Sequence, residues 1–318
     1  MEKVIDALKK YNKFLIISHI GLEGDSIGSQ FALQGLLENM GKSAVIVNED
    51  RPAAQYDFLG VRYKVINDLD IDFDYEAAVV LDCPVVKRIG KAKKFIKEGK
   101  VVINIDHHIS NGEFGDVNWV EPAASSCGEM IYRLYKAMDA PLDKRCAEFL
   151  YIAIITDTGS FAYENTTSDT HITASELLKK GLKPDIIYQS LYENRSMAEV
   201  ELLKDALVTL RVIRNGDIAH MHVTRKMLDR YNLGAEVTEG FINYARSIDK
   251  AKVAIIFIED PREKGYVHIS FRSKGKVDVN KIAALFEGGG HRKASGCVIR
   301  GDLKSVMKKV LDTVKEKL

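Results

Sequence analysis

The 318-residue sequence has almost no net charge, because its 46 basic and 45 acidic residues nearly cancel. Proteins that grip long duplex DNA or an anionic membrane do so through an excess of positive charge. This chain lacks that excess, so we expect neither long duplex nucleic acid nor a membrane among its partners. An anionic substrate would have to be bound by a local group of residues.

Cysteine is scarce, and its spacing forms no motif. There is no C-x-x-C pair and no secretory leader, which argues against a zinc knuckle or a disulfide framework for Cys83, Cys127, Cys146 and Cys297. No apolar run approaches the roughly 18 residues that a membrane helix requires. The chain begins with the amphipathic segment EKVIDALKKY. We therefore expect reduced thiols in a cytoplasmic protein.

Internal repeats and low-complexity tracts are also absent, so neither a repeat architecture nor disorder explains the length. A hydrophobic content of 46% in a chain of this size predicts about two globular domains.

The first half alternates apolar runs with helical segments. The runs are FLIISH, SAVIVN, AAVVLD and VVINIDHH, and residues 31–40 are expected to be helical. Continuous apolar runs are typical of strands buried on both faces, so we predict a mostly parallel sheet with helices on both sides. Ligands of such sheets bind at the carboxyl ends of the strands. Three runs end there in polar residues: His19, Asp82 and Asp106-His107-His108.

From Ser125 onward the pattern becomes helical and ends in a charged helix that we interpret as a connector. After the turn signal Asn215-Gly216 the chain is β-rich again (IAHMHV, VAIIFIED and YVHISFRS), with helices around residues 280–286 and 303–317. We predict a catalytic α/β domain over residues 1–195, a connecting helix over 196–213 and a smaller α/β domain over 214–318.

The segment SHIGLEGDSIGS places His19, Glu23 and Asp25 in a glycine-rich turn between a strand and a helix. Three metal-ligating side chains can converge there, although Asp25 or Ser26 could equally cap the helix. Asp82 ends an apolar strand, where an ionised carboxylate is costly to bury without a cation or hydrogen bonds. A turn role for Asp82 is the alternative.

The strand VVINIDHH gives a sharper signal. It ends in a carboxylate, Asp106, and two adjacent imidazoles, His107 and His108. Histidine is the commonest metal ligand, and an aspartate that accepts a hydrogen bond from the ring nitrogen facing away from the metal can fix its tautomer. Asp157, in IAIITDTGSF, follows another long apolar run. Four separate apolar segments thus end in a carboxylate or an imidazole, and independent helix caps would not require that coincidence.

These motifs resemble those of the DHH phosphoesterase superfamily, in the branch with a carboxy-terminal DHHA1 domain. The likeness is strongest to NrnA-type oligoribonucleases that also hydrolyse 3′-phosphoadenosine 5′-phosphate (pAp). It rests on HIGLEGD, LDCP, DHH, TDTGSF and FEGGGHRKASG, which follow one another in family order over nearly the whole chain. The resemblance implies an α/β fold in which a mostly parallel DHH domain is joined by a helical linker to a smaller α/β DHHA1 domain.

The resemblance also implies two divalent metal ions, Mn²⁺ in this family, bridged by Asp82. The implied ligands are His19, Glu23 and Asp82 for one ion and Asp25, Asp82, His107 and Asp157 for the other. His108 would lie beside the phosphate as a donor or proton carrier, and Asp106 would orient the site. Glu23 stands where the family usually has aspartate, and its longer side chain would alter metal spacing or metal choice.

The glycine-rich segment GGGHRKASG is expected to bind substrate, because consecutive glycines let backbone N–H groups surround an anion. The expected contacts are Arg272, Ser273, Gly288, Gly289, Gly290 and His291. We expect a phosphoesterase for short oligoribonucleotides or pAp. A phosphodiesterase for cyclic dinucleotides or pApA is the first alternative, and an inactive nucleotide-binding sensor is the second. A homodimer is left open.

Overall fold

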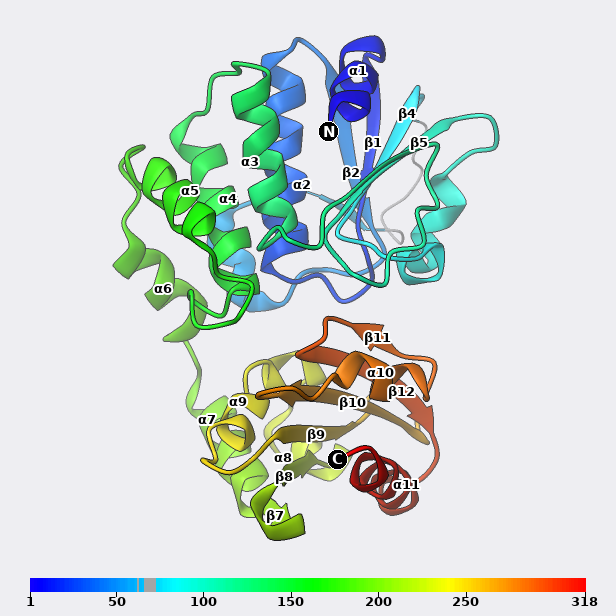
Figure 1. The fold of residues 1–318 in the computed structure, drawn as a ribbon, viewed down its shortest axis with the longest axis vertical. Helices are drawn as coiled ribbons and strands as arrows, with labels where there is room; N and C mark the ends of the chain where they lie inside the picture. Colours follow the sequence, from blue (N-terminus) through cyan, green and yellow to red (C-terminus); the bar gives the residue numbers. More distant parts are fainter. Residues whose placement is uncertain (62, 66–72) are drawn as a thin grey trace. The chain divides into compact units, whose positions relative to one another are not determined.

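The computed structural model describes residues 1–61, 63–65 and 73–318. The chain divides into two compact units, Met1–Asn194 and Arg195–Leu318 (Figure 1). Each unit contains a six-stranded sheet with helices packed against it. No helix in the described ranges is long and apolar enough to cross a membrane.

The first unit is built on a parallel sheet with the order β3-β2-β1-β4-β5-β6. Its strands are β1 (Lys13–Ile17), β2 (Ser43–Asn48), β3 (Lys64–Val65), β4 (Ala77–Leu81), β5 (Val101–Asp106) and β6 (Val117–Val120). Its helices are α1 (Glu2–Lys10), α2 (Gly24–Asn39), α3 (Cys127–Ala137), α4 (Lys144–Asp157), α5 (Ser168–Leu178) and α6 (Pro184–Tyr192), with the 3₁₀ helices η1 (Ala54–Leu59) and η3 (Val86–Phe95).

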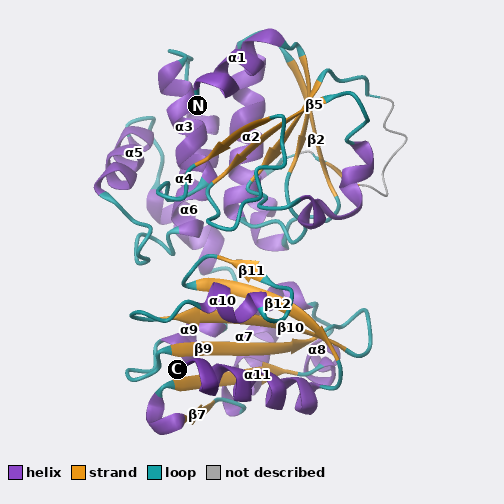
Figure 2. Ribbon diagram, turned by 45° about the vertical axis from the view of Figure 1, so that its right-hand side comes forward, coloured by secondary structure: helices purple, strands orange, loops and turns teal. Residues whose placement is uncertain are grey.

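Both faces of this sheet are buried, which explains the continuous apolar runs. In β1, Phe14 and Ile16 belong to the core beneath α2, α3 and α4, whereas Leu15 and Ile17 belong to a second core with Ile89 of η3. Figure 2 shows the helices α2, α3 and α4 on one side of the strands. The predicted parallel sheet is therefore confirmed.

Two helices that carry predicted metal ligands pack closely through glycine. A side chain at Gly24 of α2 would collide with Thr156 of α4, and one at Gly28 would collide with the carbonyl oxygen of Phe149. This close approach fixes the separation between the start of α2, which carries Asp25, and the end of α4.

We expect Gly28→Ala to lower the free energy of unfolding by about 1–3 kcal/mol, because the added methyl group overpacks the α2–α4 contact. Urea unfolding measures this change. Glu38→Ala, at an exposed position of the same helix, is the matched control and should shift the midpoint little. Equal midpoints for Gly28→Ala and the wild type would contradict the close packing.

The second unit contains a mixed sheet with the order β11-β12-β10-β9-β8-β7, in which β8 and β9 are parallel and the other pairs antiparallel. Its strands are β7 (Arg211–Ile213), β8 (Ile218–Val223), β9 (Val253–Glu259), β10 (Tyr266–Ser273), β11 (Gly289–Gly290) and β12 (Ala294–Arg300). Its helices are α7 (Met197–Val208), α8 (Arg225–Tyr231), α9 (Ile242–Arg246), α10 (Val279–Ala284) and α11 (Leu303–Lys317), with the 3₁₀ helices η4 (Arg214–Gly216) and η5 (Ala235–Thr238).

The segment predicted as a connecting helix belongs to this second unit. It forms α7 and β7, and Leu202, Leu203 and Ala206 lie in the core that α7 shares with α8 and α9. The apolar stripe of α7 packs on the sheet of this unit. The second α/β domain is confirmed, and it also contains β11 and β12, which the sequence pattern did not predict.

Candidate metal centre

Three of the predicted metal ligands lie at the carboxyl ends of three adjacent strands. β1 lies between β2 and β4, and β4 pairs with β5. From β1 the chain continues to β2 and β3 on one side of β1, and then to β4, β5 and β6 on the other side. The point between β1 and β4 is therefore a topological switch point, where open α/β sheets bind ligands. His19 follows β1, Asp82 follows β4, and His107 follows β5.

The buried Asp82 carboxylate lies between two histidines. Its Oδ2 is 3.3 Å from Nε2 of His19, and its Oδ1 is 3.6 Å from Nε2 of His107. His107 Nε2 also lies 3.5 Å from Asp25 Oδ2 and 3.7 Å from Asp157 Oδ2. One carboxylate with an oxygen beside each imidazole has the arrangement that a bridging ligand requires.

Both histidines are oriented by backbone carbonyl groups. Nδ1 of His19 is 2.7 Å from the oxygen of Ile20, and Nδ1 of His107 is 3.2 Å from the oxygen of Ala124. When Nδ1–H donates to these carbonyl oxygens, the lone pair of Nε2 faces the carboxylates. This is the tautomer that a metal-ligating histidine needs.

Asp25 is held by the start of α3, so that two distant segments meet. Its Oδ2 accepts from the backbone N–H of Cys127 at 2.7 Å, and its Oδ1 accepts from Gly128 N–H and Ser29 Oγ, each at 2.9 Å. These donors stabilise the ionised carboxylate and fix its rotamer.

Asp106 forms hydrogen bonds with His107, His108 and Asn111. Its Oδ1 accepts from the backbone N–H of His107 at 2.8 Å and lies 2.7 Å from Nδ1 of His108. Its Oδ2 accepts from Asn111 at 2.6 Å. With both oxygens engaged, Asp106 orients His108, whose other ring nitrogen, Nε2, is the one that can serve a substrate.

The charges in this cluster are strongly coupled. Burial, together with Asp82, raises the pKa of Asp25 well above its usual range. Burial raises the pKa of Asp157 to about 6, against an opposing effect of His107. Despite burial, hydrogen bonds with His107 and His19 hold the pKa of Asp82 well below its usual range. The pKa of His107 is raised well above its normal value, because Asp157, Asp82 and Asp25 outweigh its burial. A positive charge is thus favoured where the carboxylates converge.

The backbone at Asp82 is strained, since its φ is +53° in the left-handed region. Its N–H donates to the oxygen of Ile105 at 3.0 Å, which ties this conformation to β5. Such strain is uncommon for a residue with a side chain and is concentrated at functional sites.

Glu23 is placed differently from the other predicted ligands. It is exposed and precedes α2, whereas His19, Asp25, Asp82 and His107 are buried. Within the described part of the first unit, ligand atoms cluster within 4.8 Å in the groups Asp25–Asp82–His107 and Asp82–Asp106–His108. Glu23 belongs to neither group, but its charge raises the pKa of His19, after the larger effects of burial and Asp82. Its ligand role stays a prediction.

Sequence reasoning missed Asn165, which supports Asp157. Its Nδ2 lies 3.1 Å from Oδ2 of Asp157, 3.2 Å from the Asp157 carbonyl oxygen and 2.8 Å from the oxygen of Ser125. Because asparagine is common in turns, nothing in the pattern YENTTSD marked it.

We expect Asn165→Leu to weaken the binding of a divalent metal by about 10-fold or more, because the Asp157 carboxylate loses its amide donor. Calorimetric titration of the protein with a divalent metal measures this shift. Glu164→Ala, at the exposed neighbouring position, should leave the curve in place. An unchanged curve in a folded Asn165→Leu variant would show that Asn165 does not support the site.

The predicted substrate residues of the second unit do not all have the expected geometry. Gly289 and Gly290 form strand β11 and pair with Gly296 and Ser295 of β12, instead of an open anion-binding loop. The left-handed backbone is at Gly290 (φ +139°), where a Cβ would lie 2.6 Å from the oxygen of Ala294. Gly288 is also required to be glycine, because a side chain would collide with the oxygen of Gly296.

The remaining predicted substrate residues lie near these glycines. Arg272 pairs with Ala294 of β12, and its Nε is buried without a hydrogen-bond partner in the described part of the chain. Ser273 is buried, and its Oγ donates to the oxygen of Val277 at 2.8 Å. His291 is partly buried, and its backbone N–H donates to Ala294 O. Of these groups, the Arg272 guanidinium is the one best suited to an anion.

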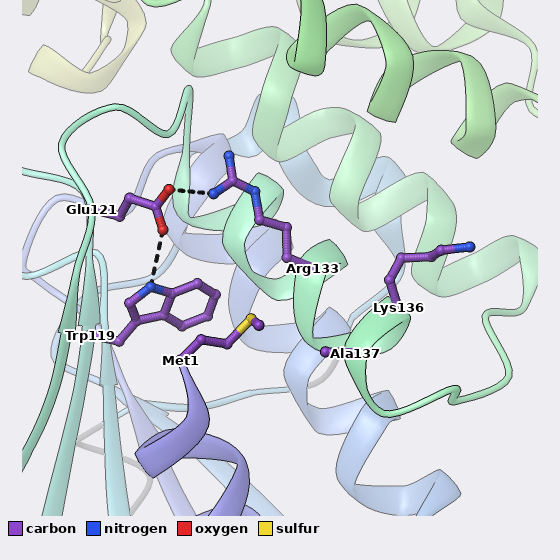
Figure 3. A pocket seen from close by; sticks show the side chains of 6 residues that line it. All are labelled: Met1, Trp119, Glu121, Arg133, Lys136 and Ala137. Atoms are coloured by element: carbon purple, nitrogen blue, oxygen red, sulfur yellow. Dashed lines mark hydrogen bonds and ion pairs between the residues drawn. The ribbon is translucent and has the colours of Figure 1, made fainter.

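A separate surface pocket of about 470 Å³ carries no such chemistry (Figure 3). Two of its charged groups are already paired, since Glu121 accepts from Nε1 of Trp119 and forms an ion pair with Arg133. The other lining residues are Met1, Lys136 and Ala137. None of the predicted metal ligands lines it.

The chain matches family models in both units: the DHH family N-terminal domain over residues 13–154 and the DHHA1 domain over residues 215–318. It is 30% identical to the probable bifunctional oligoribonuclease and PAP phosphatase NrnA of Streptococcus mutans, over 92% of this chain and 91% of that protein. It is 28% identical to the bifunctional oligoribonuclease and PAP phosphatase NrnA of Bacillus subtilis, over 93% of this chain and 92% of that protein.

A solved structure gives a similar result. The exopolyphosphatase-related protein from Bacteroides fragilis matches with a TM-score of 0.88 at 27% identity, covering 99% of this chain and 96% of that one. The protein is therefore a hydrolase of the phosphoesterase class. It belongs to the DHH family, in the branch with a DHHA1 domain, and several of its curated relatives are named NrnA.

Proposed function

We propose that this protein is a two-metal, Mn²⁺-dependent phosphoesterase that hydrolyses short nucleotides, namely oligoribonucleotides of a few residues and pAp. The observation that carries the proposal is the position of the Asp82 carboxylate, whose two oxygens lie beside the Nε2 atoms of His19 and His107. The names of the NrnA relatives support the choice of substrates.

The residues present fit a pair of divalent ions. Three carboxylates, of Asp25, Asp82 and Asp157, converge on the imidazole of His107, and mixed oxygen and nitrogen ligands suit Mn²⁺. Two bound ions of this kind activate water and neutralise charge on phosphoryl oxygens. His19 and Glu23 would hold one ion with Asp82, and Asp25, His107 and Asp157 would hold the other.

The surrounding groups orient the substrate and move protons. His108, whose Nδ1 is hydrogen-bonded to Asp106, presents Nε2 to a phosphate oxygen or to the leaving hydroxyl. Asp106 favours that tautomer. In the second unit, the Arg272 guanidinium offers a further group that can bind a nucleotide phosphate.

We expect Gly289→Val to reduce kcat/KM for natural nucleotides. The corresponding loss of transition-state stabilisation is about 1–3 kcal/mol, the size of one or two lost phosphate hydrogen bonds. The variant should fold, because the nearest atom to an added Cβ is Asn280 Oδ1 at 3.8 Å. A small chromogenic phosphodiester, cleaved by the first unit alone, should react at a near wild-type rate. Gly290→Val is the contrasting variant and should destabilise the fold, since Gly290 has a positive φ and little space. Equal losses on both substrates in folded Gly289→Val would contradict a substrate-binding role.

A turnover panel tests the proposal. Purified protein with Mn²⁺ should hydrolyse pAp and short RNA faster than cyclic di-AMP or long single strands. A preference for cyclic di-AMP or pApA would show that these dinucleotides, and not pAp and short RNA, are the substrates. The absence of turnover on every member, with metal bound, would indicate a nucleotide-binding sensor.

A further inference from the structure

Arg88 is built into the rim of the metal centre, although no motif considered above includes it. It lies in η3, the short helix that follows the Asp82 turn. Its backbone N–H donates to the oxygen of Val85 at 2.9 Å, and its backbone oxygen accepts from the N–H of Ile20 at 2.8 Å. Because Ile20 follows His19, the start of η3 is fixed against the loop that carries a predicted metal ligand.

The half-buried guanidinium of Arg88 has no carboxylate partner among the residues that the structure describes. Its Nη2 lies 3.3 Å from Nδ1 of His19, and no carboxylate oxygen of the described residues lies within 4.0 Å of its nitrogens. An arginine that supports structure is usually paired with an acid, because removing its charge from water without a partner is unfavourable.

The contact with His19 is incompatible with metal ligation by that histidine. His19 can offer the lone pair of Nε2 to a metal only when its proton is on Nδ1, where it donates to the Ile20 oxygen at 2.7 Å. Nδ1–H cannot also accept from Arg88, whose guanidinium nitrogens are all donors. In that tautomer the guanidinium has no acceptor among the described residues.

We propose that Arg88 binds a phosphate group of the nucleotide substrate beside the metal centre. This inference rests on the proposed function, and it adds a catalytic residue to that site. A phosphate supplies acceptors that the described residues do not offer the guanidinium, and the planar fork of the guanidinium binds two phosphate oxygens at once. The tautomer of His19 then links metal binding to phosphate binding. The tautomer that can ligate a metal is also the one that cannot accept a hydrogen bond from Arg88, so the guanidinium is available to the substrate.

The groups around Arg88 favour a nucleotide over an inorganic phosphate chain. Ile20 and Val85, which are hydrogen-bonded to the Arg88 backbone, expose 40% and 39% of their surface, and Val86 exposes 41%. A cation bordered by exposed aliphatic side chains suits a phosphate that is attached to an apolar base or sugar.

Binding of AMP, which forms from pAp and from adenylate residues of short RNA in the proposed reactions, tests the assignment. Calorimetric titration of Mn²⁺-loaded protein should show AMP binding about 10- to 100-fold weaker in Arg88→Gln than in the wild type, the effect of losing a charge-assisted pair of hydrogen bonds. Arg88→Lys should recover only part of the affinity, because an ammonium cannot bind two oxygens in the same way. Lys87→Gln, with the same charge change at the exposed neighbouring position, should bind AMP as the wild type does.

Two further measurements make the result decisive. Metal content should stay at the wild-type level in Arg88→Gln, and thermal unfolding should show that the variant is folded. Unchanged AMP affinity in Arg88→Gln, or a loss of affinity that parallels a loss of metal, would overturn the assignment, the latter because Arg88 would then only position His19. If the wild type hydrolyses no nucleotide, the proposed function fails, but the same titration with inorganic phosphate still decides whether Arg88 binds phosphate.

Discussion

Replacing Asp82 with alanine should lower kcat/KM by roughly 10³-fold or more, because the loss of a bridging carboxylate disturbs both metal positions. Glu23→Ala should lower kcat/KM less than Asp82→Ala does, since Glu23 is exposed and would bind only one of the two ions. Activity and metal content should be measured for both variants on the same preparation. Full activity with two bound metals in Asp82→Ala would exclude the proposed site.

Asp82→Asn is the matched control for this experiment. Asparagine keeps the shape of the side chain and tolerates the left-handed backbone at this position, where φ is +53°. The variant should therefore fold like the wild type while losing the charge that faces His19 and His107. Metal loss in Asp82→Asn would separate the ligand role of Asp82 from its structural role in the turn.

Removing the metal should abolish activity and lower the melting temperature, with a larger drop at pH 8 than at pH 5.5. Ligands that bind only the folded state, at about 1,000 times their Kd, stabilise it by about 4 kcal/mol per site. For a chain of this size two such sites correspond to a shift of the order of 10 °C at high pH. Thermal unfolding with Mn²⁺ and with a chelator, at both pH values, measures the two shifts.

The direction of this pH dependence follows from the raised pKa values of the metal-free cluster. Burial raises the pKa of Asp157 to about 6, and the surrounding carboxylates raise the pKa of His107 despite its burial. Stability from groups with raised pKa values is present at low pH and is lost as the pH rises through the folded value. The metal-free protein thus weakens toward pH 8. Metal binding, which needs ionised Asp157 and neutral His107, strengthens over the same range.

The depressed pKa of Asp82 does not change this expectation, because its stabilising effect is lost only as the pH falls below its usual range. A chelator-induced shift that is equal at the two pH values, or larger at pH 5.5, would contradict the coupling of these residues to the metal.

The sequence singled out candidate ligands that the structure brings close together, for a physical reason. Buried parallel strands need continuous apolar runs, so polar residues such as His19, Asp82 and His107 stand out where the runs end. The parallel geometry then brings the ends of β1, β4 and β5 to one edge without further information. Both the parallel sheet and the candidate ligands could therefore be read from local pattern.

The supporting residues could not be predicted in the same way. Asn165, Asn111 and Arg88 lie in turns or at the start of a short helix, where polar residues need no special explanation. Their roles depend on which segments meet in three dimensions. Similarly, three consecutive glycines indicated an open loop, because the pattern did not reveal that β12 would pair with Gly289 and Gly290.

The central claim is that Asp82 bridges two ions between His19 and His107. The most direct test is a crystal structure of the Mn²⁺-loaded protein with an anomalous difference map collected at the manganese edge. The account predicts two peaks about 3.5–4 Å apart, with one Asp82 oxygen beside each. A single peak, or peaks that Asp82 does not contact, would contradict it.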